Sequence, residues 1–183
     1  NAGRGGRYHK FADPLTELDQ VVMTRKAHLY IPALTELLVT GDLSASVCNI
    51  TLDGILTAYN LDLMAGSAMT HSNEVDSFEL NVVGDCLLRS AAHLKMTGRG
   101  LAQNTGSGAG TAGDYRRGGG GAGFVGFGGT GTGNNGSMAA GAPYVAFDGV
   151  ALGSGGGGAP SSTGGRGGGI IRVNVGGFAL IDG

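Results

Sequence analysis

The sequence contains little charge, few cysteines and no long apolar run. Only 14% of its 183 residues are charged and the net charge is −2 at pH 7, so nothing in its charge favours nucleic acid or an anionic membrane surface. Its apolar runs are far shorter than the ~20 residues that span a bilayer. We therefore expect no nucleic-acid partner and no membrane span. Two cysteines are also too few for a disulfide-rich scaffold.

Sequence motifs for catalysis and cofactor binding are missing as well. The chain has no GxSxG nucleophile motif and no GxxxxGK[ST] phosphate loop. Three stretches match GxGxxG, at 108–113, 121–126 and 131–136, but none precedes a segment with helical character, which that dinucleotide motif requires. The four histidines lack metal-ligand spacing with one another or with cysteine. We therefore expect no cofactor, no metal and no enzymatic activity.

Glycine is the abundant residue, and its distribution divides the chain. About two thirds of the 39 glycines fall in residues 103–169. Residues 1–102 have ordinary glycine content, and residues 170–183 turn apolar again. We predict a β-rich core portion over 1–102, a glycine-rich loop region over 103–169 and closing β-strands over 170–183, with the chain continuing beyond them.

The first portion has the period of β-strands. Short apolar runs at 37–45, 50–58, 78–88 and 93–102 are each interrupted by glycine, and "IIRVNV" at 170–175 alternates cleanly. The tetrapeptide "LTEL" occurs at 15–18 and again at 34–37, a spacing of 19 residues. Strands that recur at such an interval are typical of the coils of a β-solenoid. The fold class is therefore mainly β with a β-solenoid core, the alternative being an antiparallel β-sandwich with glycine-rich loops.

One segment near residues 13–23 predicts a short helix instead. Asp13 and Pro14 form an acceptable N-cap and first-turn pair. Leu15, Leu18 and Val22 would then share one helical face.

The glycine-rich region allows two interpretations, disorder or ordered loops. We favour order, because large side chains recur at intervals and could anchor the loops: Phe124, Phe127, Tyr144 and Phe147. Glycine permits tight turns and close approach of backbones between such anchors. It also allows polyproline-II segments to pack side by side.

The order of the glycine-rich blocks resembles that of a known class of proteins. The succession "RRGGGGAGFVGFGG", "GAPY", "LGSGGGG", "GGRGGGIIRVNV" and "LIDG" is similar to glycine-rich β-helix segments of very large extracellular surface proteins, adhesin-like and fibre proteins. The resemblance covers roughly residues 98–183 and the first six residues, "NAGRGG", which look like the turn after such a block. It implies an extracellular β-solenoid cut from a tandem array, in which each unit's end feeds the next unit's start.

Two alternatives to a structural role rest on particular side chains. A polysaccharide-active β-helix enzyme would need His71, Glu74 and Asp76 to converge in a groove, although residues 66–77 read more like an exposed polar loop. A carbohydrate- or ice-binding module would need a regular array of threonines, which are unevenly spaced here. Tyr115 beside Arg116 and Arg117 could stack on a sugar or phosphate, but an exposed pair before a loop explains these residues as well.

Covalent modification is predicted at four residues. The sequons "NIT" and "NGS" make Asn49 and Asn135 candidates for N-glycosylation in a protein secreted by a eukaryote. Cys48 and Cys86 are two 19-residue coils apart, too far for a bond. If residues 66–77 bulge out of the coil, the cysteines reach neighbouring coils, and we predict a Cys48–Cys86 disulfide.

These features together predict a structural protein. We expect a secreted subunit or repeat of an extracellular filament, surface adhesin or matrix layer that acts by head-to-tail assembly. Its partners would be further copies of itself, as a homopolymer or tandem repeats, and glycans. Open solenoid ends support this expectation, since their unpaired N–H and C=O groups must be capped or used.

Overall fold

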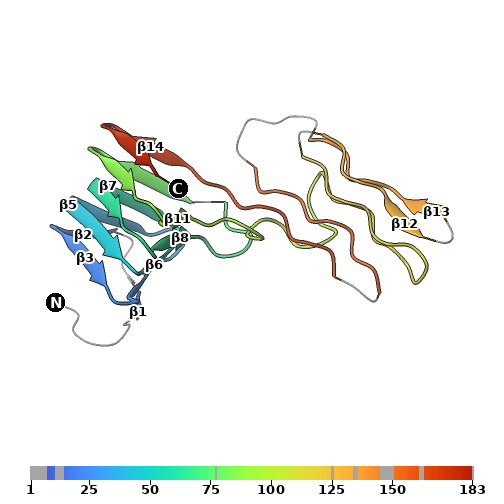
Figure 1. The fold of residues 1–183 in the computed structure, drawn as a ribbon, viewed down its shortest axis with the longest axis horizontal. Helices are drawn as coiled ribbons and strands as arrows, with labels where there is room; N and C mark the ends of the chain where they lie inside the picture. Colours follow the sequence, from blue (N-terminus) through green and yellow to red (C-terminus); the bar gives the residue numbers. More distant parts are fainter. Residues whose placement is uncertain are drawn as a thin grey trace. The chain divides into compact units, whose positions relative to one another are not determined.

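The computed structural model describes residues 8–10, 15–76, 78–124, 126–133, 136–144, 151–160 and 163–182. The chain forms two compact units (Figure 1). The solenoid unit comprises residues 1–72, 77–95 and 171–183, and the glycine unit comprises residues 73–76 and 96–170. All regular secondary structure in the described ranges is β-strand, and they contain no helix that could cross a membrane.

The solenoid unit is built from short strands. In chain order they are β1 (Tyr8–Lys10), β2 (Leu15–Leu18), β3 (Val21–Thr24), β4 (His28–Ile31), β5 (Glu36–Ser46), β6 (Asn49–Leu52), β7 (Ile55–Leu63), β8 (Ala68–Thr70), β9 (Glu79–Val82), β10 (Cys86–Leu88), β11 (His93–Leu94), β14 (Val173–Val175) and β15 (Ala179–Ile181). Most of the glycine unit lies in the sequence between β11 and β14, and its residues 73–76 lie between β8 and β9.

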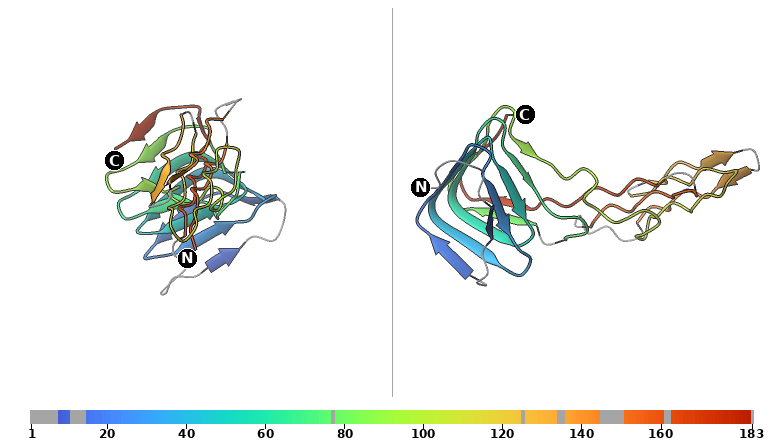
Figure 2. Two further views of the ribbon diagram at one scale, coloured as in Figure 1. Left: turned by 90° about the vertical axis from the view of Figure 1, so that its right-hand side faces the viewer. Right: turned by 90° about the horizontal axis from the view of Figure 1, so that it is seen from below.

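The strands of the solenoid unit stack in parallel into two sheets. One sheet has the order β1-β4-β6-β8-β11, and in the other β5 pairs with β2 and β3 on one side and with β7 on the other, followed by β9 and β10 and finally β14 and β15. The chain thus winds through about 4 turns, as the coiled path in Figure 2 shows. The predicted β-solenoid is confirmed, and the antiparallel sandwich is excluded because every pairing in these sheets is parallel.

The core consists of apolar columns that run from coil to coil. Leu37 pairs with Leu56, and Leu56 pairs with Leu80; all three are at most 1% exposed. Strand residues alternate in direction, so every second side chain of each coil joins such a column. Burying one leucine in this way stabilises the fold by roughly 1.5–3 kcal/mol.

Polar side chains connect the coils at one corner. The Asn60 side chain donates to Asp42 Oδ1 at 2.8 Å and accepts the backbone N–H of Asp85 at 2.8 Å. Asp85 Oδ1 in turn accepts the N–H of Phe178 at 2.9 Å. The bonds from Asp85 and Phe178 satisfy backbone donors that lie between strands.

The "LTEL" repeat is not the repeat of the coil. Leu15 pairs with Glu36 rather than with Leu34, two residues out of the predicted register. Leu34 lies in a turn with φ 62 and is 96% exposed. The tetrapeptide therefore recurs by coincidence, although the fold inferred from it is correct.

The predicted helix near residues 13–23 is wrong. Residues 15–18 and 21–24 form β2 and β3, which both pair with β5, while Asp13 and Pro14 lie outside the described residues. The backbone of these residues bonds to β5 instead of to itself. Valine at 21 and 22 and threonine at 24 also favour strand over helix.

The glycine unit is ordered with very little regular secondary structure. Its strands form one antiparallel hairpin, β12 (Gly131–Gly133) with β13 (Gly136–Met138). The rest of the unit consists of extended segments that run side by side (Figures 1 and 2). The predicted ordered glycine-rich loops are thus confirmed in the described part of the region.

Backbone hydrogen bonds between these segments recur at every third residue. Leu101 and Asn104 donate their N–H groups to the carbonyls of Gly153 and Gly156, at 3.0 and 3.1 Å. The same spacing recurs where Gly110 and Gly113 donate to Gly155 and Gly158, where Gly153 and Gly156 donate to Gly168 and Gly165, and where Gly120 and Gly123 donate to Thr111 and Gly108. A period of three is that of polyproline-II segments, which have three residues per turn.

Candidate functional site

His71 belongs to the core and not to a groove. It follows β8 and is 0% exposed. Its Nδ1 donates to the carbonyl of Ser72 at 2.6 Å, which fixes the tautomer because a carbonyl only accepts. Asp53, 3% exposed, accepts the backbone N–H and the hydroxyl of Ser72 at 2.7 and 2.6 Å. This arrangement satisfies buried polar groups within the solenoid unit.

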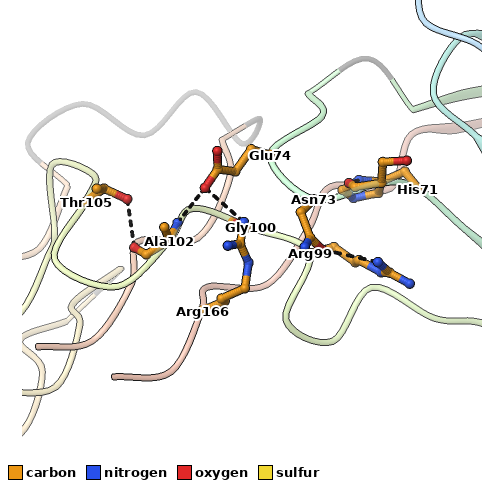
Figure 3. Close-up of polar contacts among 9 residues, drawn as sticks. His71, Asn73, Glu74, Arg99, Gly100, Ala102, Thr105 and Arg166 are labelled. Carbon is orange, nitrogen blue, oxygen red and sulfur yellow. Dashed lines mark hydrogen bonds and ion pairs between the residues drawn. The ribbon is translucent and has the colours of Figure 1, made fainter. Parts of the chain in front are cut away.

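Glu74 connects two segments of the glycine unit through its carboxylate (Figure 3). Its Oε1 accepts the N–H of Ala102 and a guanidinium N–H of Arg166, each at 2.9 Å. Arg166 also donates to the carbonyl of Gly100 at 2.9 Å, and the N–H of Glu74 donates to the carbonyl of Arg99 at 2.8 Å. The carboxylate therefore holds the first and last segments of the unit together.

The alternative of a polysaccharide-active enzyme would need His71, Glu74 and Asp76 to line one groove. Glu74 is paired with Arg166, Asp76 is exposed and His71 is buried in the solenoid unit. The prediction that residues 66–77 form an exposed loop is also wrong, because residues 68–70 are β8. No group of three His, Cys, Asp or Glu side chains in the described ranges could hold a metal ion.

The predicted loop anchors differ in their surroundings. Phe124 and Tyr144 pack edge to face with ring centroids 5.0 Å apart, and the Tyr144 hydroxyl bonds to the Leu152 carbonyl and to Ser154 Oγ, both at 2.7 Å. Phe124 also lines a shallow cavity of about 330 Å³. Phe127 is 78% exposed and does not anchor a loop, while Phe147 lies outside the described residues.

The predicted disulfide is wrong. Cys48 and Cys86 are both free and buried, and burial raises the pKa of the Cys86 thiol. β8 lies inside residues 66–77, so these residues are part of the coil and no loop can be excised. The coil of β7 and β8 separates the two cysteines, and a two-coil gap of about 10 Å exceeds the ~7 Å limit between Cα atoms.

The two glycosylation candidates remain predictions. Asn49 begins β6, and its side chain is exposed, as modification requires. Asn135 lies outside the described residues.

The coil formed by β14 and β15 exposes apolar side chains. Ile181 pairs with Leu88, which pairs with Leu63. Leu63 and Leu88 are 0% and 4% exposed, but Ile181 is 75% exposed. Among the described strands, β14 and β15 each pair on one side only, so this edge also presents unpaired N–H and C=O groups.

A second exposed feature is the turn at residues 114–117 of the glycine unit. Asp114 Oδ1 accepts the N–H of Arg116 at 2.9 Å, and its Oδ2 accepts the Arg117 Nε–H at 2.8 Å and an Nη2–H of the same guanidinium. Hydrogen bonds from Arg117 and from the Arg116 backbone lower the pKa of Asp114. The backbone of Arg117 also forms an antiparallel β-bridge with Gly133 of the hairpin. Within this fixed frame, Tyr115 is 91% exposed.

Sequence reasoning named Tyr115, Arg116 and Arg117 but missed the role of Asp114. The spacing of an acid and an arginine three residues apart across a turn was the available signal. The bridge to Gly133 had no signal in the sequence, because it depends on how distant segments pack.

Comparison of the chain with protein-family models, with curated proteins and with solved structures finds no match.

Proposed function

We propose that this protein is a structural unit of an extracellular filament, surface adhesin or matrix layer and acts by head-to-tail assembly. The observation that carries the proposal is the exposed edge formed by β14 and β15. Ile181 occupies a column whose preceding members are buried. Such an edge is a template for another strand.

The parallel stacking favours a second copy, or a further repeat, as the occupant. Every coil runs in the same direction, so a copy shifted along the stack would place β2 and β3 beside β14 and β15 in the orientation found inside the solenoid. In the described chain β2 and β3 each pair with β5 alone. Among the described strands, the outer edge of β2 and β3 therefore has no partner.

Sedimentation velocity of the protein over a range of micromolar concentrations tests this proposal. We expect species larger than the monomer that grow with concentration. Ile181→Lys should abolish them, because a charge would have to be buried between coils. Tyr59→Lys is the matched control, since Tyr59 is 53% exposed but lies on β7, an inner strand.

Two outcomes would contradict head-to-tail assembly. One is a protein that stays monomeric at all concentrations. The other is Ile181→Lys assembling as well as the parent protein, which would move the contact away from this edge. Secretion is tested separately, by locating the protein in its native host.

A further inference from the structure

We infer that two copies of this chain join in one register, in which β14 of one copy lies beside β2 of the next with Val173 opposite Thr16. In the same register β15 lies beside β3, with Ile181 opposite Met23. The inference rests on the proposed head-to-tail assembly and adds to it which residue of one copy meets which residue of the other.

Four core columns cross the larger sheet of the solenoid unit and reach both of its edges. Their inner members are all at most 4% exposed: Leu37, Leu56 and Leu80; Val39, Ala58 and Val82; Leu43, Leu61 and Cys86; and Ala45, Leu63 and Leu88. In the same order, the columns end at Val173, Val175, Ala179 and Ile181 on one edge and at Thr16, Leu18, Val21 and Met23 on the other. One edge stacked on the other therefore continues all four columns at once.

Other registers break these columns. A shift of one residue would turn the outward side chain of Asn174 to the level of the core, because successive side chains of a strand point to opposite faces. A shift of two residues would place Val175 opposite Gln20, which lies between β2 and β3 and not in either strand. Only the register with Val173 opposite Thr16 keeps both strands of each edge paired.

The corner between the two halves of each coil fits this register as well. Two residues separate the inner columns at 19–20 and at 59–60, and three separate them at 40–42, 83–85 and 176–178. Inside the chain a two-residue corner stacks on a three-residue corner wherever β5 meets β2 and β3, β5 meets β7, and β7 meets β9 and β10. The proposed joint stacks 176–178 on 19–20 of the next copy, which is the same combination.

The backbone of β14 presents hydrogen-bonding groups to the open side at the column positions. The Arg172 carbonyl accepts the N–H of Leu80 at 3.0 Å, and the Gly176 N–H donates to the Val82 carbonyl at 2.8 Å. Successive residues of a parallel strand direct their N–H and C=O groups to opposite neighbours. The groups of Val173 therefore point away from β9, toward the open edge.

The same alternation holds inside the solenoid, where core-facing residues bond to the following coil. The carbonyl of the core residue Ala58, for example, accepts the N–H of Val83 at 3.0 Å. On β2 the alternation leaves the groups of the outward residues Leu15 and Glu17 on the open side. In the proposed register the N–H of Val173 donates to the Leu15 carbonyl of the next copy, and the Val173 carbonyl accepts the N–H of Glu17.

Disulfide trapping between two single variants tests the register. Asn174 lies opposite Glu17 of the next copy, and both residues are exposed. Their Cα atoms would be about 4.8 Å apart, within the ~7 Å limit for a disulfide. An equimolar mixture of Asn174→Cys and Glu17→Cys should therefore form covalent dimers on mild oxidation, which a non-reducing gel separates and peptide mass spectrometry assigns.

Asn174→Cys mixed with Leu15→Cys is the matched control. Leu15 lies on the same strand and face as Glu17 and is 56% exposed, but two residues along the strand place its Cα about 8 Å from that of Asn174. We expect roughly tenfold less dimer from this mixture, since the separation exceeds the disulfide limit. Each variant oxidised alone gives the background from random collisions.

The second edge strand gives an independent repeat of the test. Leu180 lies opposite Val22 of the next copy, and these residues are 39% and 64% exposed. Leu180→Cys mixed with Val22→Cys should also form dimers. This pair decides the result if a variant at residue 17 or 174 no longer assembles in its reduced form.

The outcomes separate the register from the assembly itself. Equal yields from the Glu17→Cys and Leu15→Cys mixtures, a higher yield from Leu15→Cys, or no dimer from any mixture while the parent protein assembles would overturn the register and leave the proposed function standing. A parent protein that stays monomeric in sedimentation would overturn both. It would mean that something other than a second copy covers this edge.

Discussion

Replacing Gly157 with alanine tests whether contacts between backbones hold the glycine unit together. A Cβ at this position would lie within 3.0 Å of the Thr111 carbonyl oxygen and carbon. The Gly157 N–H also donates to the Gly120 carbonyl at 2.7 Å. Gly165 is the matched control, because a Cβ there would meet nothing within 4 Å. Neither glycine has a positive φ, so the two variants differ in contact rather than in backbone strain.

The expected magnitudes have opposite signs. Forcing a methyl group against a neighbouring backbone costs roughly 1–3 kcal/mol, and losing the hydrogen bond of Gly157 adds about 1 kcal/mol. Gly165→Ala instead reduces the freedom of the unfolded chain and stabilises by roughly 0.4–1 kcal/mol. At about 2–4 °C per kcal/mol for a chain of this size, Gly157→Ala should melt roughly 4–16 °C lower and Gly165→Ala slightly higher.

Thermal unfolding followed by the amide NMR signals of the glycine unit measures this difference without interference from the solenoid unit. Hydrogen exchange adds a second measurement, because the bonded Gly157 amide should exchange more slowly than Gly165. Equal melting temperatures for the two variants would refute packed glycine segments, as would exchange of both amides within seconds.

Four further predictions follow from the structure. Both Cys48 and Cys86 should react with a thiol label under denaturing, non-reducing conditions. If neither cysteine reacted, the result would show that they form a disulfide. Leu56→Ala should destabilise the solenoid unit by roughly 2–5 kcal/mol in urea unfolding, and a loss below 1 kcal/mol would contradict a tightly packed column. The pKa of Asp114 is lowered in the folded state, so its contribution is present above the unfolded pKa and is lost as pH falls through the folded one; Asp114→Asn should remove this pH dependence from the NMR signals of the turn. Intact mass before and after glycan removal should show an occupied Asn49 if the native protein is secreted by a eukaryote.

The sequence allowed the solenoid to be predicted because each strand carries its own period of two. Every second residue of a coil is apolar whichever coil lies next to it, as in "FELNVV", where Leu80 and Val82 are buried. The register could not be predicted in the same way. It depends on how many residues each turn takes, and Leu15 pairs with Glu36 whereas Glu36 pairs with Ile55. Unequal coils therefore misled the "LTEL" alignment, whereas the disulfide prediction failed because it excised residues 66–77, which contain β8.

The glycine unit was harder to read, because its regularity lies in the backbone. A run such as "GGGG" at 155–158 gives no sign of which glycine faces a neighbour, yet Gly155 and Gly158 accept hydrogen bonds from one segment while Gly156 accepts one from another. The anchor prediction failed at Phe127 for the same reason. We predicted that large side chains hold the loops in place, but backbone hydrogen bonds connect the segments.

Close contacts between glycine backbones restrict the positions at which the glycine unit can carry a side chain. Its inner positions cannot accept a side chain, since a Cβ at Gly120 or Gly157 would meet a backbone. Side chains therefore find room only at the turns and at outward-facing positions such as Gly165, where a Cβ would meet nothing within 4 Å.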